Sequence, residues 1–163
     1  MKSIELQMLQ TLYEQDFCAW VEQTAELLRC LRLATPTHHW DKLDLENLIE
    51  EVVDLGKSQQ RALQSTLRLV LSYLLKWKYQ PEHRSHSWQI TITRERLNID
   101  ELLQESPRLR RFLNDAEWIN TTYQRARREA IVETGLSEEN FAIACPFTTD
   151  EILDLDFYPN VDE

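Results

Sequence analysis

Apolar side chains recur every three or four residues through the middle of this chain, and this long periodic segment constrains the fold more than any other feature. Such spacing places the side chains on one face of an α-helix. The stripe comprises Leu45, Leu48, Ile49, Val52, Leu63, Leu67, Val70, Leu71 and Leu74. Asp44 precedes it and is a suitable N-cap residue. The pattern predicts a helix from about residue 45 to residue 79.

A glycine interrupts the middle of this predicted helix. Gln59 and Gln60 follow Gly56 at positions where the stripe requires apolar side chains. A glycine inside a helix costs about 1 kcal/mol relative to alanine. We therefore expect a kink or a short break in the helix near Gly56.

A shorter amphipathic helix is predicted before the long one. Asp16 can cap it, and the positions of its apolar face are Phe17, Trp20, Val21, Thr24, Leu28 and Leu31. Residues 33–44, LATPTHHWDKLD, break the helical period and contain a proline. This segment is therefore predicted to be a loop.

The stretch LLKWKYQPEHRSHSW, residues 74–88, is predicted to be the bend between two helices. Pro81 cannot continue the long helix, and Ser85 or Ser87 can cap the next. The stripe of that next helix comprises Trp88, Ile92, Ile99, Leu102 and Leu103. Its run QITIT resembles a strand, but no second strand-like run exists to pair with it.

A last long helix is predicted to begin at Ser106-Pro107, a helix-start signature, and to end at Gly135, a C-cap residue. Its stripe comprises Leu109, Phe112, Leu113, Ala116, Ile119, Tyr123 and Ala130. Two short helices are predicted after it, near 138–143 and 149–154. The capping-box pattern Thr148-x-x-Glu151 opens the second.

These elements predict an all-α fold: a bundle of four principal helices with short C-terminal helices packed across it. The chain has 163 residues, of which only two are glycine and five are proline, so few residues are available for tight turns. A domain of this length buries about two thirds of the surface of its unfolded chain. We expect one helical domain over residues 1–163.

The net charge of −10 disfavours binding to nucleic acid and to anionic membranes. The N-terminal residues MKSIELQMLQ lack the apolar core of a secretory signal, and no segment approaches the ~18 apolar residues of a membrane span. Cys18, Cys30 and Cys145 are an odd number without C-x-x-C spacing, which indicates reduced thiols. We expect a cytoplasmic protein.

Several blocks of the sequence together resemble one bacterial family. They are Asp16-Phe17 with Trp20, LDLENLIEEVVDLG, LLKWKYQP with SW, SPRL, ETGL and ACPFT. In this order they are similar to the family called domain of unknown function 29, abundant in cyanobacteria, over about residues 12–159. The resemblance implies an all-helical bacterial cytoplasmic protein. It implies no catalytic residues, and the two His of HRSH are not part of the family pattern.

One face of the long helix is acidic. Glu46, Glu50 and Asp54 fall within an arc of about 80°, with Glu51 further round the same polar side. Carboxylates spaced in this way repel one another unless a cation lies between them, and Mg²⁺ prefers oxygen ligands. Glu50-Glu51-x-x-Asp54 resembles half of the acidic motif of all-α nucleotide pyrophosphatases typified by the MazG family.

The other half of that motif, E-x-x-D on a facing helix, is missing, because Glu95 is followed by Asn98 at the required spacing. The alternative is a solvated face whose charge is partly relieved by Lys57 and Arg61.

The histidines suggest a second metal site. His83 and His86 are three residues apart and could be joined by His38 and His39 from the predicted loop. Zinc needs three or four converging ligands, so this pair supplies only half a site. Exposed polar side chains in a proline-containing bend are the simpler interpretation.

Charge is also segregated along the chain. Residues 61–96 contain seven Arg and Lys against two acids, whereas 138–163 contain eight acids and no base. The acidic tail could lie against the basic middle, within one chain or between copies. Alternatively, the basic segment could bind a phosphate-bearing partner, with Trp77, Tyr79 and Trp88 as stacking groups. For these three aromatic side chains, packing between helices is the interpretation we favour.

Solvated helix faces are expected for Arg108, Arg110, Arg111, Arg125, Arg127 and Arg128.

We therefore expect a non-enzymatic protein without a cofactor that binds another macromolecule, either a protein partner or a second copy of itself. Nucleic acid and membrane are not expected as partners. The alternative is a Mg²⁺-dependent nucleotide pyrophosphohydrolase whose catalytic residues are Glu46, Glu50, Glu51 and Asp54, with the metal on Glu46, Glu50 and Asp54.

Overall fold

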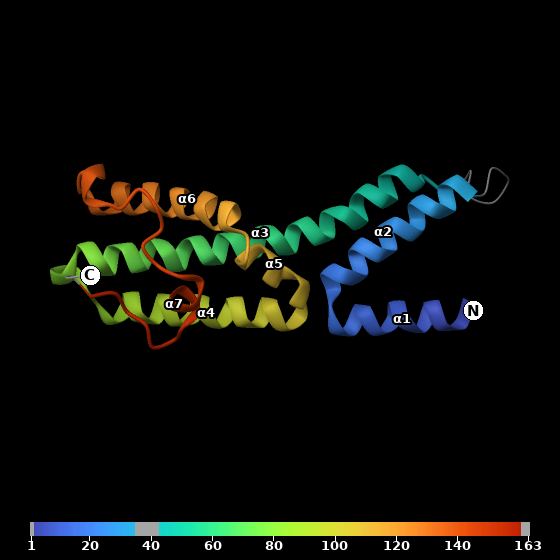
Figure 1. Cartoon of the computed structure of the whole chain (residues 1–163), viewed down its shortest axis with the longest axis horizontal. Coiled ribbons are helices and arrows are strands. Elements are labelled where there is room, and N and C mark those ends of the chain that lie inside the picture. Colours follow the sequence, from blue (N-terminus) through green and yellow to red (C-terminus); the bar gives the residue numbers. More distant parts are fainter. Residues whose placement is uncertain (1, 35–42, 161–163) are drawn as a thin grey trace. The chain divides into compact units, whose positions relative to one another are not determined.

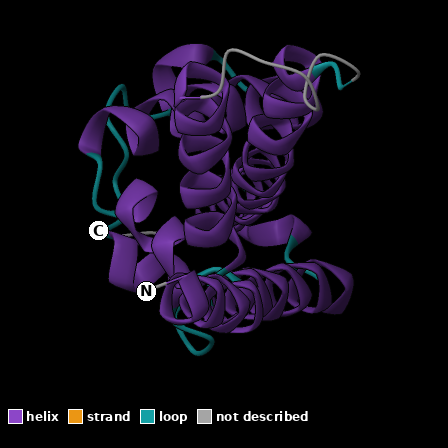
Figure 2. Ribbon diagram, turned by 90° about the vertical axis from the view of Figure 1, so that its right-hand side faces the viewer, coloured by secondary structure: helices purple, strands orange, loops and turns teal. Residues whose placement is uncertain are grey.

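The computed structural model describes residues 2–34 and 43–160, and within these ranges all regular structure is helical (Figures 1 and 2). The elements are α1 (Lys2–Gln15), α2 (Phe17–Ala34), α3 (Leu45–Tyr79), η1 (Pro81–His83), α4 (His86–Glu105), η2 (Pro107–Leu109), α5 (Arg110–Leu113), α6 (Ala116–Thr134), η3 (Glu138–Asn140) and α7 (Thr149–Leu153), where η denotes a 3-10 helix. The all-α prediction is confirmed, and the four predicted principal helices are α2, α3, α4 and α6. Most of the predicted loop 33–44 lies outside the described residues.

The chain divides into two compact units. Unit 1 comprises Met1–Ala62 and Leu102–Leu109, and unit 2 comprises Leu63–Glu101 and Arg110–Glu163. Helices α3 and α4 contribute residues to both units. The single domain over 1–163 stays a prediction.

Unit 1 is built from α1, α2, the first half of α3 and the turn η2. Its buried apolar side chains are Cys18, Val21, Ala25, Leu45, Ile49, Leu103 and Leu109. Leu48, which the apolar stripe of the long helix includes, is exposed. Helix α1 is absent from the sequence prediction altogether.

The long helix α3 runs through Gly56 without a break, so the predicted short break is wrong, whereas a kink there stays a prediction. A neighbouring helix accounts for the glycine. A Cβ atom at Gly56 would lie only 3.1 Å from Cγ1 of Val21 in α2. Gly56 therefore permits close approach of α2 and α3, and this packing offsets the low helix propensity of glycine.

Unit 2 holds the larger core. The second half of the α3 stripe is completely buried there, at Leu63, Leu67, Val70, Leu71 and Leu74. Polar contacts join α3 to α6 beside this core: the Gln64 side chain donates to Thr122 Oγ1 at 3.2 Å, and Lys76 Nζ lies 2.6 Å from Glu133 Oε2.

The predicted continuous helix after Ser106 is wrong, because the chain breaks between α5 and α6. Asp115 adopts an extended backbone conformation, and its side chain accepts hydrogen bonds from the backbone N–H groups of Glu117 and Trp118. Asp115 is therefore the N-cap of α6. The Ser106 hydroxyl is buried without a hydrogen-bond partner, so it does not cap a helix. Gly135 ends α6 in the left-handed conformation, as predicted.

Other predicted boundaries are confirmed by their hydrogen bonds. Asp16 Oδ1 accepts from the N–H of Ala19, and Asp44 Oδ1 accepts from that of Asn47. The capping box of Thr148 is complete at the start of α7. Such contacts involve residues three positions apart, which is why a local pattern is sufficient to predict them.

The segment after α6 folds back over the other helices of unit 2, ending in α7 and an extended tail (Figure 1). Arg96 of α4 is buried and donates hydrogen bonds to the carbonyl oxygens of Glu151, Ile152 and Phe157, at 2.8–3.1 Å. Arg84 similarly donates to the carbonyl oxygen of Pro159 at 3.4 Å. The acidic tail thus lies against the basic middle within one chain, and backbone carbonyls accept these arginine hydrogen bonds.

Arg127 also departs from the predicted solvated face, because it is buried against the same segment. Its guanidinium donates to the Glu138 carboxylate at 2.7 Å and to the carbonyl oxygens of Glu138 and Phe141 at 2.9 and 3.2 Å. The segment after α6 has little helical hydrogen bonding of its own, so these donors satisfy its carbonyls.

Candidate functional site

The acidic face of α3 is open to solvent. Glu46, Glu50, Glu51 and Asp54 are all exposed, and Glu46 forms an ion pair of 2.6 Å with Arg32 of α2. Carboxylates in this setting lack the enclosing ligands that fix a metal ion.

At the other end of the acidic face, Lys57 partly relieves the negative charge, as the alternative interpretation predicts. Its ammonium lies 2.8 Å from Asp54 Oδ1. The hydrogen bond and the positive charge of Lys57 hold the pKa of Asp54 below its ordinary value, with a smaller contribution from Arg61. In the described ranges, no group of three His, Cys, Asp or Glu side chains is arranged to hold a metal ion.

The histidines are placed only in part. His83 in η1 and His86 at the start of α4 are both exposed. The His86 ring nitrogen lies 3.4 Å from the Gln89 side-chain oxygen. His38 and His39 lie outside the described residues, so the suggested four-histidine set stays a prediction.

The aromatic side chains of the basic middle pack inside unit 2. Trp77 lies against Tyr158 and Tyr79 against Phe141, with ring centroids 4.9 and 4.8 Å apart. Trp88 meets the edge of Tyr73 at 6.3 Å. These rings therefore join helices to the C-terminal segment and to one another, the packing role favoured from the sequence.

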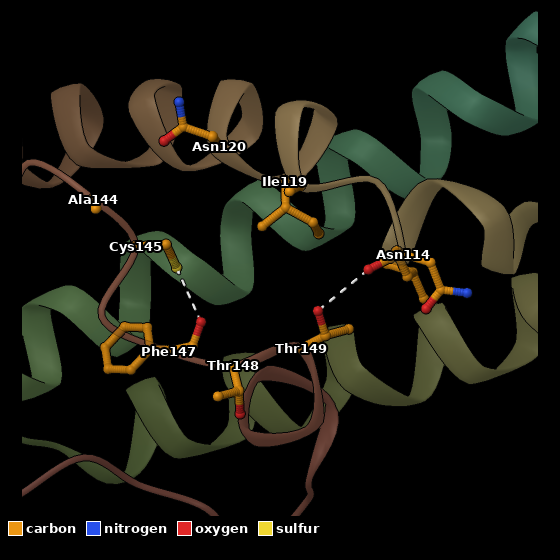
Figure 3. A pocket seen from close by; sticks show the side chains of 10 residues that line it. Asn114, Ile119, Asn120, Ala144, Cys145, Phe147, Thr148 and Thr149 are labelled. Atoms are coloured by element: carbon orange, nitrogen blue, oxygen red, sulfur yellow. Dashed lines mark hydrogen bonds between the residues drawn. The ribbon is translucent and has the colours of Figure 1, made fainter.

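Unit 2 contains a shallow pocket of about 480 Å³ beside the α5–α6 turn (Figure 3). Apolar side chains from Leu113, Ile119 and Phe147 line it, together with the amides of Asn114 and Asn120. Thr149 at the start of α7 donates a hydrogen bond to the Leu113 carbonyl oxygen at 3.3 Å, which ties α7 to this turn.

The one thiol in this pocket is protonated at neutral pH. Burial raises the pKa of Cys145, and its Sγ donates a hydrogen bond to the Phe147 carbonyl oxygen at 3.4 Å. A protonated thiol is a poor nucleophile. The pocket therefore offers hydrogen bonds and apolar contact, and its cysteine is not activated for covalent chemistry.

A second depression lies in unit 1, between α1 and α2. It has a volume of about 610 Å³. Leu6, Leu9, Gln10, Tyr13 and Glu14 of α1 line one side, and Trp20 and Thr24 of α2 line the other. We call this depression the α1–α2 groove.

Aromatic packing fixes one end of the α1–α2 groove. The Tyr13 ring meets Trp20 edge to face, with centroids 5.0 Å apart, and Phe17 stacks on Trp20 at 5.7 Å. Sequence reasoning missed this groove because it did not predict α1. The signal was present in Leu6, Leu9 and Tyr13, which fall within about 60° of one another on a helix.

Together these features define an all-α protein with an apolar groove on a helical hairpin and, in its described part, no assembled set of metal ligands. No described helix is long and apolar enough to cross a membrane. The chain belongs to the family described as Domain of unknown function DUF29, whose model matches residues 12–158. The expected boundaries, about 12–159, are thereby confirmed.

One solved structure extends the comparison. It is an α-helical protein of unknown function from Rhodospirillum rubrum, 26% identical in sequence, with a TM-score of 0.69. The match covers 89% of this chain and 90% of that one. No curated protein matches. The resemblance to bacterial proteins agrees with the sequence prediction, whereas a cyanobacterial source and a cytoplasmic location stay predictions.

Proposed function

We propose that this protein is a non-enzymatic protein-binding module and that its α1–α2 hairpin forms the binding surface. One observation carries the proposal: among the described side chains of α1, residues 6–15, none is buried. Yet this stretch contains five large apolar residues, namely Leu6, Met8, Leu9, Leu12 and Tyr13.

The apolar residues of α1 occur on more than one side of the helix. Leu6 and Met8 are separated by about 160° around the helix axis. Both are exposed, by 59% and 47% of their surface, and Tyr13 is exposed by 57%. A helix that is apolar on opposite sides is ordinarily enclosed, whereas α1 contacts its own chain mainly along α2. A partner that covers α1 would supply the missing enclosure.

Exposed apolar side chains also gather in unit 1 as a whole. Of the fourteen large apolar side chains exposed among the described residues, nine belong to residues 1–62. Burying one leucine side chain contributes about 1.5–3 kcal/mol. A surface with several such side chains is typical of a protein interface.

The Mg²⁺-dependent nucleotide pyrophosphohydrolase remains the alternative. It needs Glu46, Glu50, Glu51 and Asp54 to converge on a cation. Their exposure and the ion pairs with Arg32 and Lys57 favour the binding module instead.

Site-specific photocrosslinking in the source cells tests the proposal. A benzophenone amino acid placed at Leu6 should yield adducts with one or a few proteins of defined mass. The same probe at Val132, an apolar residue of α6 that is 81% exposed, is the matched control and should yield none. Excess unlabelled wild-type chain should suppress the Leu6 adduct, and a Tyr13→Asp chain should not. Equal adducts at both positions, or no protein adduct at Leu6, would contradict the proposal.

A further inference from the structure

The length of the α1–α2 groove and the spacing of its apolar side chains suit a bound helix. The part of α1 that lines it, from Leu6 to Glu14, is about 12 Å long, or two helical turns. Leu6, Leu9 and Tyr13 present apolar side chains at i, i+3 and i+7 along this length. A partner helix that lies in such a groove presents anchors with the same spacing.

Other peptide conformations fit the groove less well. An added β-strand needs free backbone groups along a sheet edge, and the walls here are helices whose backbone groups bond internally. A proline-rich segment docks in slots between aromatic rings. Tyr13 and Trp20 instead pack edge to face on each other at an interplanar angle of 79°, which leaves no slot between them.

The C-terminal end of α1 carries a negative charge that forms no ion pair among the described residues. Glu14 lies in the last turn of α1, where the helix dipole is also negative, and no basic residue occurs in that turn. Arg108 of η2 pairs with Glu22 of α2, and its Nε atom lies 2.6 Å from Glu22 Oε2. A carboxylate at this position disfavours the helix unless a cation lies nearby.

The net negative charge of unit 1 favours a cationic partner over a second copy of the chain. Residues 1–62 contain six Lys and Arg against eleven Asp and Glu, and residues 102–109 contain one of each, so the unit carries a formal charge of −5. A second copy would bring the same negative charge to the interface. A cationic partner instead gains from the field of the unit and from Glu14.

Resting on the proposed protein-binding function, we propose that the α1–α2 groove binds a basic amphipathic α-helix of another protein. Its apolar anchors at i, i+3 or i+4 and i+7 contact Leu6, Leu9, Tyr13 and Trp20. A Lys or Arg at one end of that helix pairs with the Glu14 carboxylate.

Selection from a peptide-display library tests this inference on the full chain. The library carries leucine at helical spacing and random residues at the polar positions, and a control library carries proline-rich sequences. Helical binders enriched in Lys and Arg are expected. A synthetic copy of the strongest one should bind Tyr13→Ala at least tenfold more weakly and Glu14→Gln about three- to fivefold more weakly. The matched control variant Val132→Ala should bind it as wild type does.

Each remaining outcome overturns the inference in a distinct way. Binders that need Tyr13 but are acidic, or indifferent to Glu14→Gln, contradict the basic partner and leave protein binding intact. Proline-rich binders contradict the helix. If the wild-type chain sediments as a dimer and the Tyr13→Ala chain as a monomer, a second copy of the chain occupies the groove. Tyr13→Ala removes the ring contacts with Phe17 and Trp20, so its unfolding midpoint should fall slightly. Wild-type circular dichroism at the temperature of the binding measurement separates lost binding from lost folding.

Discussion

The Asp16 carboxylate accepts a hydrogen bond from the backbone N–H of Arg108 at 2.9 Å, although the two residues are 92 positions apart in the sequence. The other oxygen of the same carboxylate caps α2 by accepting from the N–H of Ala19 at 3.0 Å. One side chain therefore begins a helix and holds the turn η2 against it. This double role helps to hold residues 107–109 within unit 1.

Asp16→Ala should lower the free energy of unfolding by about 2 kcal/mol, because it removes a helix cap and a tertiary hydrogen bond of about 1 kcal/mol each. Urea denaturation followed by circular dichroism measures this loss. In Asp16→Ala, the amide protons of α2 and η2 should exchange faster than in the wild-type chain. Asp16→Asn keeps an acceptor oxygen for the cap, but its NH2 group cannot accept from the N–H of Arg108, so it should lose about half as much. A loss close to zero in Asp16→Asn would show that the carboxylate has no separate role toward Arg108.

Gly56→Ala should change the free energy of unfolding differently in two backgrounds. Alanine favours the helix by about 1 kcal/mol over glycine, but its Cβ would lie 3.1 Å from Cγ1 of Val21, which is too close without a local shift. Removing that neighbour with Val21→Ala should relieve the crowding. A double-mutant cycle should therefore show Gly56→Ala to be more favourable by at least about 0.5 kcal/mol in the Val21→Ala chain. Identical effects in both backgrounds would mean that close packing is not the reason for the glycine.

Asp16 and Gly56 show what a local sequence pattern can and cannot predict. The N-caps Asp16, Asp44 and Thr148 were predicted because their hydrogen bonds join residues within one turn. The close packing at Gly56 involves a side chain of α2, which no single-helix pattern contains. Tertiary packing overrides propensity at such positions.

The candidate site was less predictable than the fold, for two physical reasons. Leu6 and Met8 lie on different sides of α1, so the helix lacks the single stripe by which an amphipathic helix is recognised. The groove also needs Trp20 of α2, and its pairing with Tyr13 is a tertiary contact. The acidic face was located correctly on the polar side of α3, but Arg32, which pairs with Glu46, comes from another helix.

We expect no Mg²⁺-dependent release of pyrophosphate or phosphate when the protein is screened across nucleotides. Glu50 and Glu51 face solvent, and Lys57 already pairs with Asp54. A weak surface carboxylate cluster exchanges Mg²⁺ without fixing its coordination geometry. Turnover that requires Mg²⁺ and disappears in Glu50→Gln, but persists in the distant control Glu117→Gln, would establish the enzyme alternative instead.

The three thiols should react at clearly different rates with a thiol reagent such as DTNB. Cys30 is exposed, Cys145 is half-buried and Cys18 is buried. Burial raises the pKa of Cys145, so its thiolate forms only at higher pH. One fast phase is expected, and Cys30→Ser should remove it. The rate of the slower Cys145 phase should keep rising with pH above the ordinary pKa of a cysteine thiol. A fast phase that survives Cys30→Ser and is lost in Cys145→Ser would show an activated thiol in the unit 2 pocket.

Arg96→Lys should loosen the C-terminal segment while leaving the helices of unit 2 folded. The planar guanidinium donates to three carbonyl oxygens at once, those of Glu151, Ile152 and Phe157, whereas a lysine ammonium cannot match that arrangement. Leaving buried carbonyls without donors should cost about 2–4 kcal/mol.

Hydrogen exchange measures that cost for Arg96→Lys directly. The amides of Asp154 and Phe157, which are hydrogen-bonded within the segment, should exchange much faster in the variant. The amides of α6 should change less. Arg94→Lys is the matched control, because Arg94 is mostly exposed and a lysine at this position can still pair with the buried Glu95 carboxylate. Unchanged exchange at Asp154 and Phe157 in Arg96→Lys would mean that the aromatic contact between Trp77 and Tyr158 holds the segment without the arginine.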